Sequence, residues 1–124
     1  MKDCIFCNIS SERIILESEF AFVIRDNFPV TYLHSLIIPK RHCIDYFSLT
    51  KDELLSCDAL LKQTKISIQN DDGLVKGFNI GMNAGITAGQ TIFHCHIHLI
   101  PRRHGDVKNP RGGIRHLMPG KGDY

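Results

Sequence analysis

The residues best suited to chemistry in this chain of 124 residues are its seven histidines and five cysteines. Both types bind metals, and both act as nucleophiles or transfer protons near neutral pH. His94, His96 and His98 stand at alternate positions. In an extended strand, alternate side chains share a face, so we expect a row of imidazoles about 6.6 Å apart, at about 3.3 Å per residue. A polar strand face that happens to contain histidine is the simpler interpretation, but three alternate histidines favour a shared chemical role.

A glycine-rich segment, residues 81–91, lies directly before this row. Glycine lets backbone N–H groups turn toward one point, an arrangement that binds phosphate oxygens. Asn83, Gln90 and Thr91 add polar side chains to the segment. Most glycine-rich loops are plain turns, but the position of this one beside the imidazoles predicts a phosphate-binding loop.

A second group of reactive residues is the Cys-x-x-Cys pair formed by Cys4 and Cys7. A redox pair, a zinc site and chance remain open for such a pair. A redox pair is expected after a buried strand, and only three residues precede Cys4, which disfavours that interpretation. The other cysteines show no regular spacing and are expected to be reduced core residues: Cys43, Cys57 and Cys95.

Composition and charge are those of an ordinary globular protein. Hydrophobic residues make up 43% and charged residues 23%, which disfavours disorder. The formal net charge of +2 is too small to predict a nucleic acid or a membrane as partner. The first residues lack a basic segment followed by an apolar one, and no apolar run approaches the length of a membrane span. We therefore expect a cytoplasmic protein.

The elements that must position these residues can be predicted from periodicity. Runs rich in β-branched and aromatic residues predict five strands: 13–16, 20–25, 34–38, 78–82 and 91–100. Thr50 and Glu53 have the spacing of a capping box and predict a helix over residues 51–70. Four apolar residues at near-helical spacing predict the face of this helix that packs on the sheet: Leu54, Cys57, Leu61 and Ile68.

The order of these elements predicts an α+β fold built on a mostly antiparallel sheet. We expect a single domain over residues 1–124, with a core over 1–103 and a basic tail over 104–124. The tail could be an ordered arm near the substrate, but its composition favours a solvated C-terminus.

The segment from His94 to Ile100 resembles the His-φ-His-φ-His-φ-φ signature of the histidine triad (HIT) superfamily, with Cys95 as the first φ residue. Residues 88–91, 101–102 and 34–40 also resemble motifs of that superfamily. The resemblance implies the zinc-containing, Hint-like hydrolase branch. It also implies a HIT-like fold, with a five-stranded sheet, one long helix and a short N-terminal helix.

The resemblance further implies an activity. Members bind nucleotides and hydrolyse or transfer nucleoside monophosphates from conjugates such as phosphoramidates or dinucleoside polyphosphates. His96 matches the nucleophile, which forms a covalent nucleotidyl-histidine intermediate. His98 matches a histidine that contacts the phosphate, and His34 matches one that supports the nucleophile from behind. No catalytic metal is required, and a purine nucleotide and a second copy of the chain, forming a homodimer, are the implied partners.

Ligand positions follow from the same resemblance. Asp26 matches a residue that binds the ribose hydroxyls. The phosphate-contacting positions match Asn83, Gly89, Gln90, Thr91 and His98. A structural zinc site, closed by two thiolates and two imidazoles, matches Cys4, Cys7, His42 and His94.

Two other functions remain open at this stage. The histidine row could hold a catalytic metal, as in metallohydrolases, although the sequence shows no acidic ligand close to the row. The protein could also be a nucleotide-binding regulator without an enzymatic role.

Overall fold

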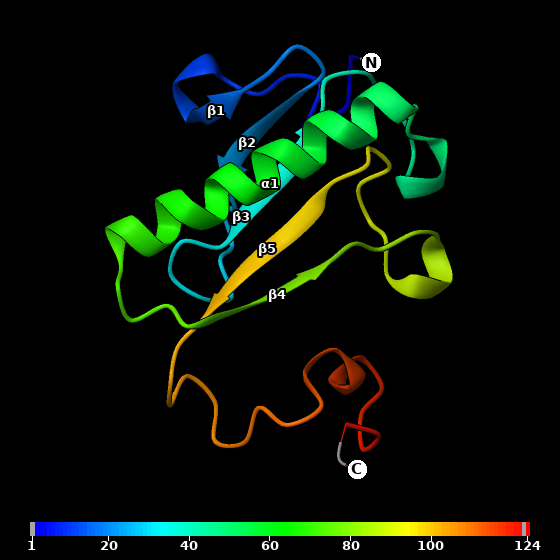
Figure 1. Ribbon diagram of the computed structural model, residues 1–124. Coiled ribbons are helices and arrows are strands. Elements are labelled where there is room, and N and C mark those ends of the chain that lie inside the picture. The colour runs from blue at the N-terminus through cyan, green and yellow to red at the C-terminus, as the bar shows by residue number, and fades with distance from the viewer. Residues whose placement is uncertain (1, 123) are drawn as a thin grey trace.

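The structure is a computed structural model that describes residues 2–122 and 124, and within them it confirms the α+β fold (Figure 1). One antiparallel sheet has the strand order β1-β2-β3-β5-β4. Its strands are β1 (Ile14–Glu17), β2 (Ala21–Arg25), β3 (Ser35–Pro39), β4 (Gly77–Gly81) and β5 (Ile97–Arg102). The helix α1 (Lys51–Asp71) crosses one face of the sheet. The expected short N-terminal helix is a single 3-10 turn, Ser11–Arg13.

Helix α1 begins at the predicted capping box. The Thr50 side chain accepts from the Glu53 N–H, and the Glu53 carboxylate accepts from the Thr50 N–H. The face packed on the sheet differs in part from the prediction, since Leu54 is 38% exposed. The buried positions are Glu53, Cys57, Leu60, Thr64 and Ile68. The prediction missed Glu53 and Thr64 because both are polar. Glu53 is buried through its pairing with Arg41, and the Thr64 hydroxyl donates to a backbone carbonyl within the helix.

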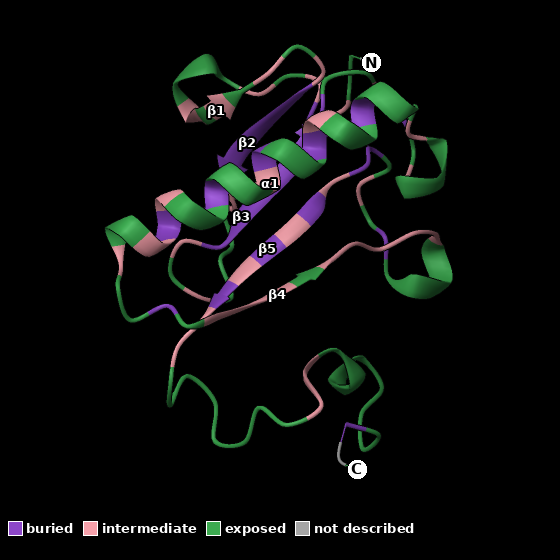
Figure 2. Ribbon diagram, viewed as in Figure 1, coloured by how far each residue is buried: buried purple, intermediate pink, exposed green. Residues whose placement is uncertain are grey.

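Two apolar clusters lie on opposite faces of the sheet. The cluster under α1 contains Ala21, Val23, Ile37, Cys57, Leu60, Ile68, Val75, Ile97 and Leu99. The second cluster contains Phe6, Phe22, Ile24, Leu36 and Ile38. Strand alternation sends successive residues of β2 and β3 to different clusters. Figure 2 accordingly shows both strands as buried, except at the last residue of β2, Arg25. Each fully buried aliphatic or aromatic side chain contributes about 1.5–3 kcal/mol, so both faces anchor the sheet.

The strand that carries the histidines is shorter at its start than predicted. It begins at Ile97 rather than at residue 91, and it continues through Pro101 to Arg102. The segment before Ile97 leaves the sheet, because the Cys95 N–H donates to the Cys43 carbonyl in a loop, 2.7 Å away. Of the three histidines only His98 lies within β5, whereas His94 and His96 precede it.

The C-terminal segment after β5 is mostly exposed (Figure 2). It turns back through the 3-10 segment Gly113–Leu117 and encloses, with β4 and β5, a hollow of about 620 Å³. Its lining includes Asn79, Ile100 and Ile114. In the described part of the chain, no helix is both long and apolar enough to span a membrane.

Candidate active site and metal centre

A second hollow, of about 360 Å³, lies on the sheet face opposite α1. It brings together residues that are far apart in the sequence. Those predicted as functional are Asp26, His34, Asn83, Thr91, His96 and His98. His98 lies on β5 between Leu36 of β3 and Gly81 of β4, so its ring has a backbone neighbour without a side chain on one flank. Asn83 and Thr91 of the glycine-rich segment thus line the same hollow as His96 and His98.

The ring of His96 has a defined orientation. Its Nδ1 lies 2.8 Å from the backbone carbonyl of His94, and because a carbonyl only accepts, Nδ1 carries the proton. In the neutral ring Nε2 then holds the lone pair. Neutral imidazole nitrogen is a nucleophile near pH 7. The rings of His96 and His98 are 5.2 Å apart between centroids.

A chain of hydrogen bonds also fixes the tautomer of His98. The Val30 N–H donates to Nδ1 of His34 at 3.1 Å, so the proton of the neutral His34 ring is on Nε2. That Nε2–H faces Nδ1 of His98 at 2.9 Å and donates to it. The proton of neutral His98 is therefore on Nε2, which is available as a donor. The resemblance implied that His34 supports the nucleophile, but its hydrogen bond goes to His98 instead.

Electrostatics keep His98 and His34 neutral. Burial, followed by the neighbouring His96 and His34, lowers the pKa of His98 to about 4, although Asp26 opposes the shift. Burial also lowers the pKa of His34, again against the effect of Asp26. Near pH 7 both rings are thus neutral, as the hydrogen-bond chain requires.

Asp26 lies at the edge of this chain. Its Oδ2 is 3.5 Å from Nε2 of His34 and 4.0 Å from Nδ1 of His98, and its Oδ1 accepts from the Phe28 N–H. The fold thus places an acidic group beside two histidines, and the three side chains have the donor types and spacing of a metal site. The Val30 N–H argues against a metal there, because it leaves the proton of His34 on the nitrogen that would have to bind it.

Two of the residues predicted to contact phosphate shape the glycine-rich loop and do not line the hollow. Gln90 is buried, with its Oε1 accepting from the Gly85 N–H and its Nε2 donating to the carbonyls of Ile44 and Ile92. Gly89 has φ +88°, a conformation that L side chains rarely adopt. Both residues shape the loop that presents Asn83 and Thr91 to the hollow, and neither lines it.

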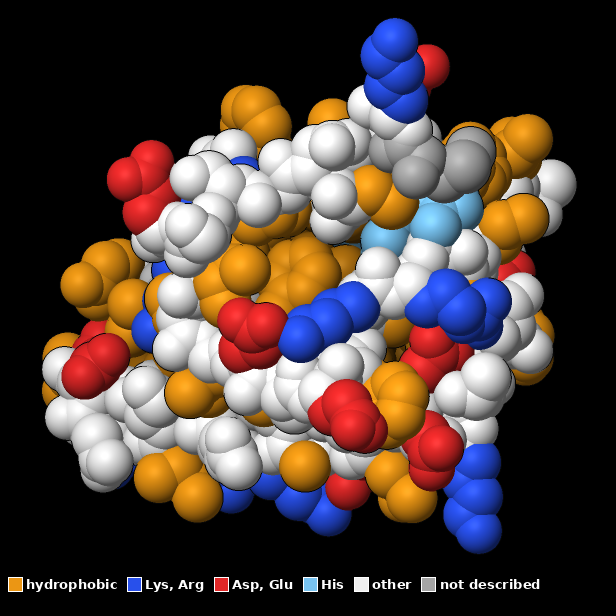
Figure 3. All heavy atoms as spheres, turned by 90° about the horizontal axis from the view of Figure 1, so that it is seen from above, with side chains coloured by type: hydrophobic (Ala, Val, Ile, Leu, Met, Phe, Trp, Pro, Cys, Tyr) orange, Lys and Arg blue, Asp and Glu red, His pale blue; other side chains and the backbone are white. Residues whose placement is uncertain are grey.

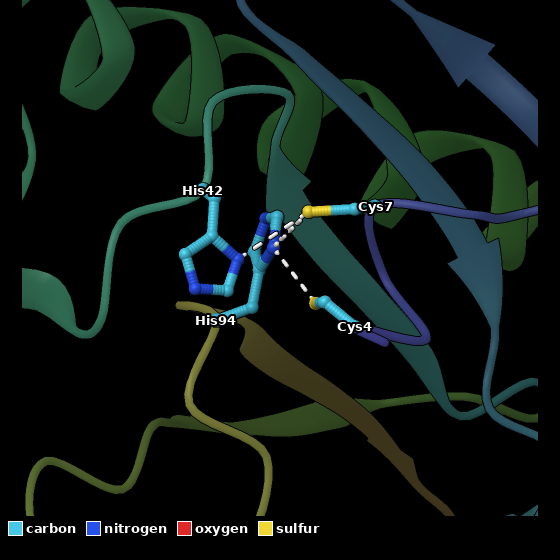
Figure 4. A group of neighbouring side chains, drawn as sticks. All are labelled: Cys4, Cys7, His42 and His94. Carbon is cyan, nitrogen blue, oxygen red and sulfur yellow. Dashed lines mark hydrogen bonds between the residues drawn. The ribbon is translucent and has the colours of Figure 1, made fainter. Parts of the chain in front are cut away.

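The four predicted zinc ligands converge on one point (Figure 4). Nδ1 of His94 is 3.4 Å from Sγ of Cys4 and 3.5 Å from Sγ of Cys7, and Nδ1 of His42 is 3.3 Å from Sγ of Cys7. Tetrahedral zinc, with Zn–S near 2.3 Å and Zn–N near 2.05 Å, places sulfur and nitrogen about 3.6 Å apart. The arrangement therefore fits zinc with little movement.

Neighbouring groups support this assignment of the ligands. Nε2 of His94 donates to the Pro39 carbonyl at 2.8 Å, which leaves the lone pair on Nδ1, directed at the thiols. Burial and the adjacent Cys4 raise the pKa of Cys7, as expected for two thiols that ionise together only beside a cation. Cys57 and Cys95 differ, since burial raises the pKa of both to about 12 and makes them inert core thiols.

Several residues that line the hollow were not predicted from the sequence. Phe6 and Arg13 both line it, and the Arg13 guanidinium donates to the Arg25 carbonyl. The position of Phe6 between two expected metal ligands was a usable signal. On the face seen in Figure 3, the visible histidine side chains gather in one small group beside hydrophobic side chains.

Comparison with known proteins decides the family. The HIT domain family model matches residues 9–105, most of the chain. The chain belongs to the histidine triad family. A HIT-like protein of Mycoplasma genitalium is 38% identical over 103 residues, which are 80% of this chain and 72% of that protein. The adenylylsulfatase HINT3 of Arabidopsis thaliana is 37% identical over 113 residues, 84% of this chain and 54% of HINT3.

Solved HIT structures share the fold. A zinc-bound histidine triad protein of Mycobacterium smegmatis has a TM-score of 0.76 at 34% identity, over 85% of this chain and 78% of that one. A HIT family hydrolase of Clostridium thermocellum has a TM-score of 0.70 at 29% identity, over 85% of this chain and 95% of that one. HIT membership thus agrees with the fold and with the His94–His98 signature.

Proposed function

We propose that this HIT protein is a hydrolase of nucleotide conjugates, which it cleaves at the α-phosphate through a nucleotidyl-histidine intermediate on His96. The observation that supports it most is the pair of fixed tautomers: a lone pair on Nε2 of His96 beside a proton on Nε2 of His98. The family contains proteins described as a hydrolase and as an adenylylsulfatase. Nucleoside phosphoramidates and dinucleoside polyphosphates are the proposed substrates.

The reaction consists of two displacements. In the first, Nε2 of His96 attacks the α-phosphorus, a P–N bond to the ring forms, and the bond to the leaving group breaks. The Nε2–H of His98 donates a hydrogen bond to the departing atom, which takes up a proton from solvent if it is an amine, while the Nδ1–H of His96 continues to donate to the His94 carbonyl. In the second, water attacks the phosphorus and releases one proton to solvent, the P–N bond breaks, and the nucleoside monophosphate leaves with His96 restored to its neutral form.

The remaining residues of the hollow bind the substrate. The Asp26 carboxylate accepts from both ribose hydroxyls of a purine nucleotide, and Asn83 and Thr91 donate to the phosphate oxygens. Gln90 and Gly89 act through the shape of the loop. The chain is proposed to work in the cytoplasm as a homodimer. Light scattering on the purified protein would test the dimer.

A zinc ion is proposed at Cys4, Cys7, His42 and His94. Two thiolates and two imidazoles complete its coordination, so the ion would supply structural stability rather than a reactive position. It would tie the N-terminal segment to the residues just before β5.

The test is the release of AMP from adenosine phosphoramidate by the wild-type protein and by His96→Asn. We expect turnover by the wild type and its loss in the variant. Unchanged turnover in the variant would refute the mechanism, and AMP binding without turnover on any leaving group would instead favour a regulator. Complete loss of activity with a chelator in a protein that stays folded, with activity restored by added metal, would favour a metallohydrolase.

A further inference from the structure

The segment between the two cysteines carries a side chain that the proposed chemistry does not yet use. Phe6 lies between Cys4 and Cys7, each within 3.5 Å of Nδ1 of His94. The neighbouring Ile5 is 57% exposed, whereas Phe6 is 6% exposed. Because a metal at the cluster would hold the chain on both sides of Phe6, its ring would have little freedom to move.

The Phe6 ring is in direct contact with the proposed nucleophile. Its centroid is 4.9 Å from that of His96 with 64° between the planes, and 6.0 Å from that of His94 with 88° between the planes. These are edge-to-face arrangements, which are favourable for aromatic pairs. His96 is thus restrained on one side by its hydrogen bond to the His94 carbonyl and on another by Phe6.

We propose that Phe6 is a positioning residue that couples the Cys/His cluster to His96. Metal bound at the cluster holds Phe6 against the ring, and Phe6 keeps Nδ1 of His96 on the His94 carbonyl and Nε2 directed into the hollow. The proposal rests on the proposed function for its kinetic consequence, but its structural consequence is measurable without turnover.

Phe22 provides a matched control. It is also 6% exposed, belongs to the same apolar cluster as Phe6 and lies on β2. Within the described residues, it is not part of the lining of the hollow that contains His96. Phe22→Leu and Phe6→Leu should therefore lose similar packing, while only Phe6→Leu removes the contact with His96.

The experiment compares the zinc-loaded wild type, Phe6→Leu and Phe22→Leu. NMR of ¹⁵N-histidine-labelled protein follows the Nδ1–H of His96, and steady-state kinetics with adenosine phosphoramidate give kcat and KM. In Phe6→Leu we expect faster solvent exchange of that proton and a kcat about two- to tenfold lower, the range set by an edge-to-face pair. Phe22→Leu should match the wild type in both. A role as a pocket wall alone would raise KM and leave kcat and the proton signal unchanged, which would overturn the proposal.

A second arm tests the coupling to the metal. Chelation of the wild type should produce the same change in the His96 signal, and chelation of Phe6→Leu should add nothing further. Independent, additive effects of chelation and substitution would overturn the coupling. If circular dichroism shows that the metal-free protein is unfolded, the comparison of the zinc-loaded variants alone decides the role of Phe6. Absence of turnover in the wild type would count against the proposed function, while the NMR comparison would still decide the role of Phe6.

Discussion

His34→Asn tests the chain of hydrogen bonds that sets the proton on His98. His34 is 3% exposed and donates from Nε2 to Nδ1 of His98 at 2.9 Å. The shorter asparagine cannot reach that acceptor, so the substitution leaves a buried acceptor unpaired and lets the His98 ring change tautomer. Leaving a buried group unsatisfied costs about 1–3 kcal/mol. Expressed fully in the transition state, that range corresponds to a fall in kcat/KM of about 5- to 150-fold.

The assay compares two adenosine substrates that differ only in the leaving group. An amine must gain a proton as it departs, whereas a nitrophenol leaves as the anion. We therefore expect the full loss with the phosphoramidate and a much smaller one with the nitrophenyl ester. His104→Asn, a change at an exposed histidine, should leave both rates at the wild-type level. Equal losses with both leaving groups, or no loss at all, would refute hydrogen-bond donation by His98 to the leaving group.

Three further predictions concern stability. Cys4→Ser or chelation should lower the free energy of unfolding, since free zinc at one hundred times its dissociation constant contributes about 2.7 kcal/mol; an unchanged urea midpoint would contradict the zinc site. Because the pKa of His98 is about 4 in the folded state, below its ordinary 6.5, the unfolded chain binds more protons between these values and stability falls as the pH falls through that window. After allowance for solvent screening at this half-buried ring, the free energy of unfolding falls by about 1–2 kcal/mol between pH 7 and pH 4.5. Urea unfolding at both pH values measures this effect as the loss in the wild type minus the loss in His98→Gln, and a zero difference would contradict it. Glu53→Gln should cost about 1–3 kcal/mol in thermal unfolding, because it weakens both the capping box and the pairing with Arg41, and a wild-type melting temperature would refute that.

Much of the fold could be predicted from local patterns. The hairpin, the third strand, the capping box at Thr50 and the long helix all depend on contacts between near neighbours in the chain. The packed face of α1 was only partly predicted, because Glu53 and Thr64 are buried through hydrogen bonds that polarity alone does not reveal.

The arrangement of the site depends on long-range contacts that local patterns do not contain. Strict alternation placed His94 in a row with His96, but the bond from Cys95 to Cys43 takes that segment out of the sheet. Gln90 has the polarity of a phosphate ligand, yet its amide bonds to the Gly85 N–H and to the carbonyl of the distant Ile44. Asp26 is distant from the histidine signature in sequence and meets it only because β2, β3 and β5 are neighbours.

The central claim is the covalent intermediate on His96. Its most direct measurement is a rapid quench of the wild-type protein with adenosine phosphoramidate, followed by digestion and mass spectrometry of the peptide that contains the three histidines. We predict one adenylyl group, acid-labile and located on His96, that forms and decays at rates consistent with kcat. Turnover without any adduct, or an adduct on His98 in place of His96, would contradict the account.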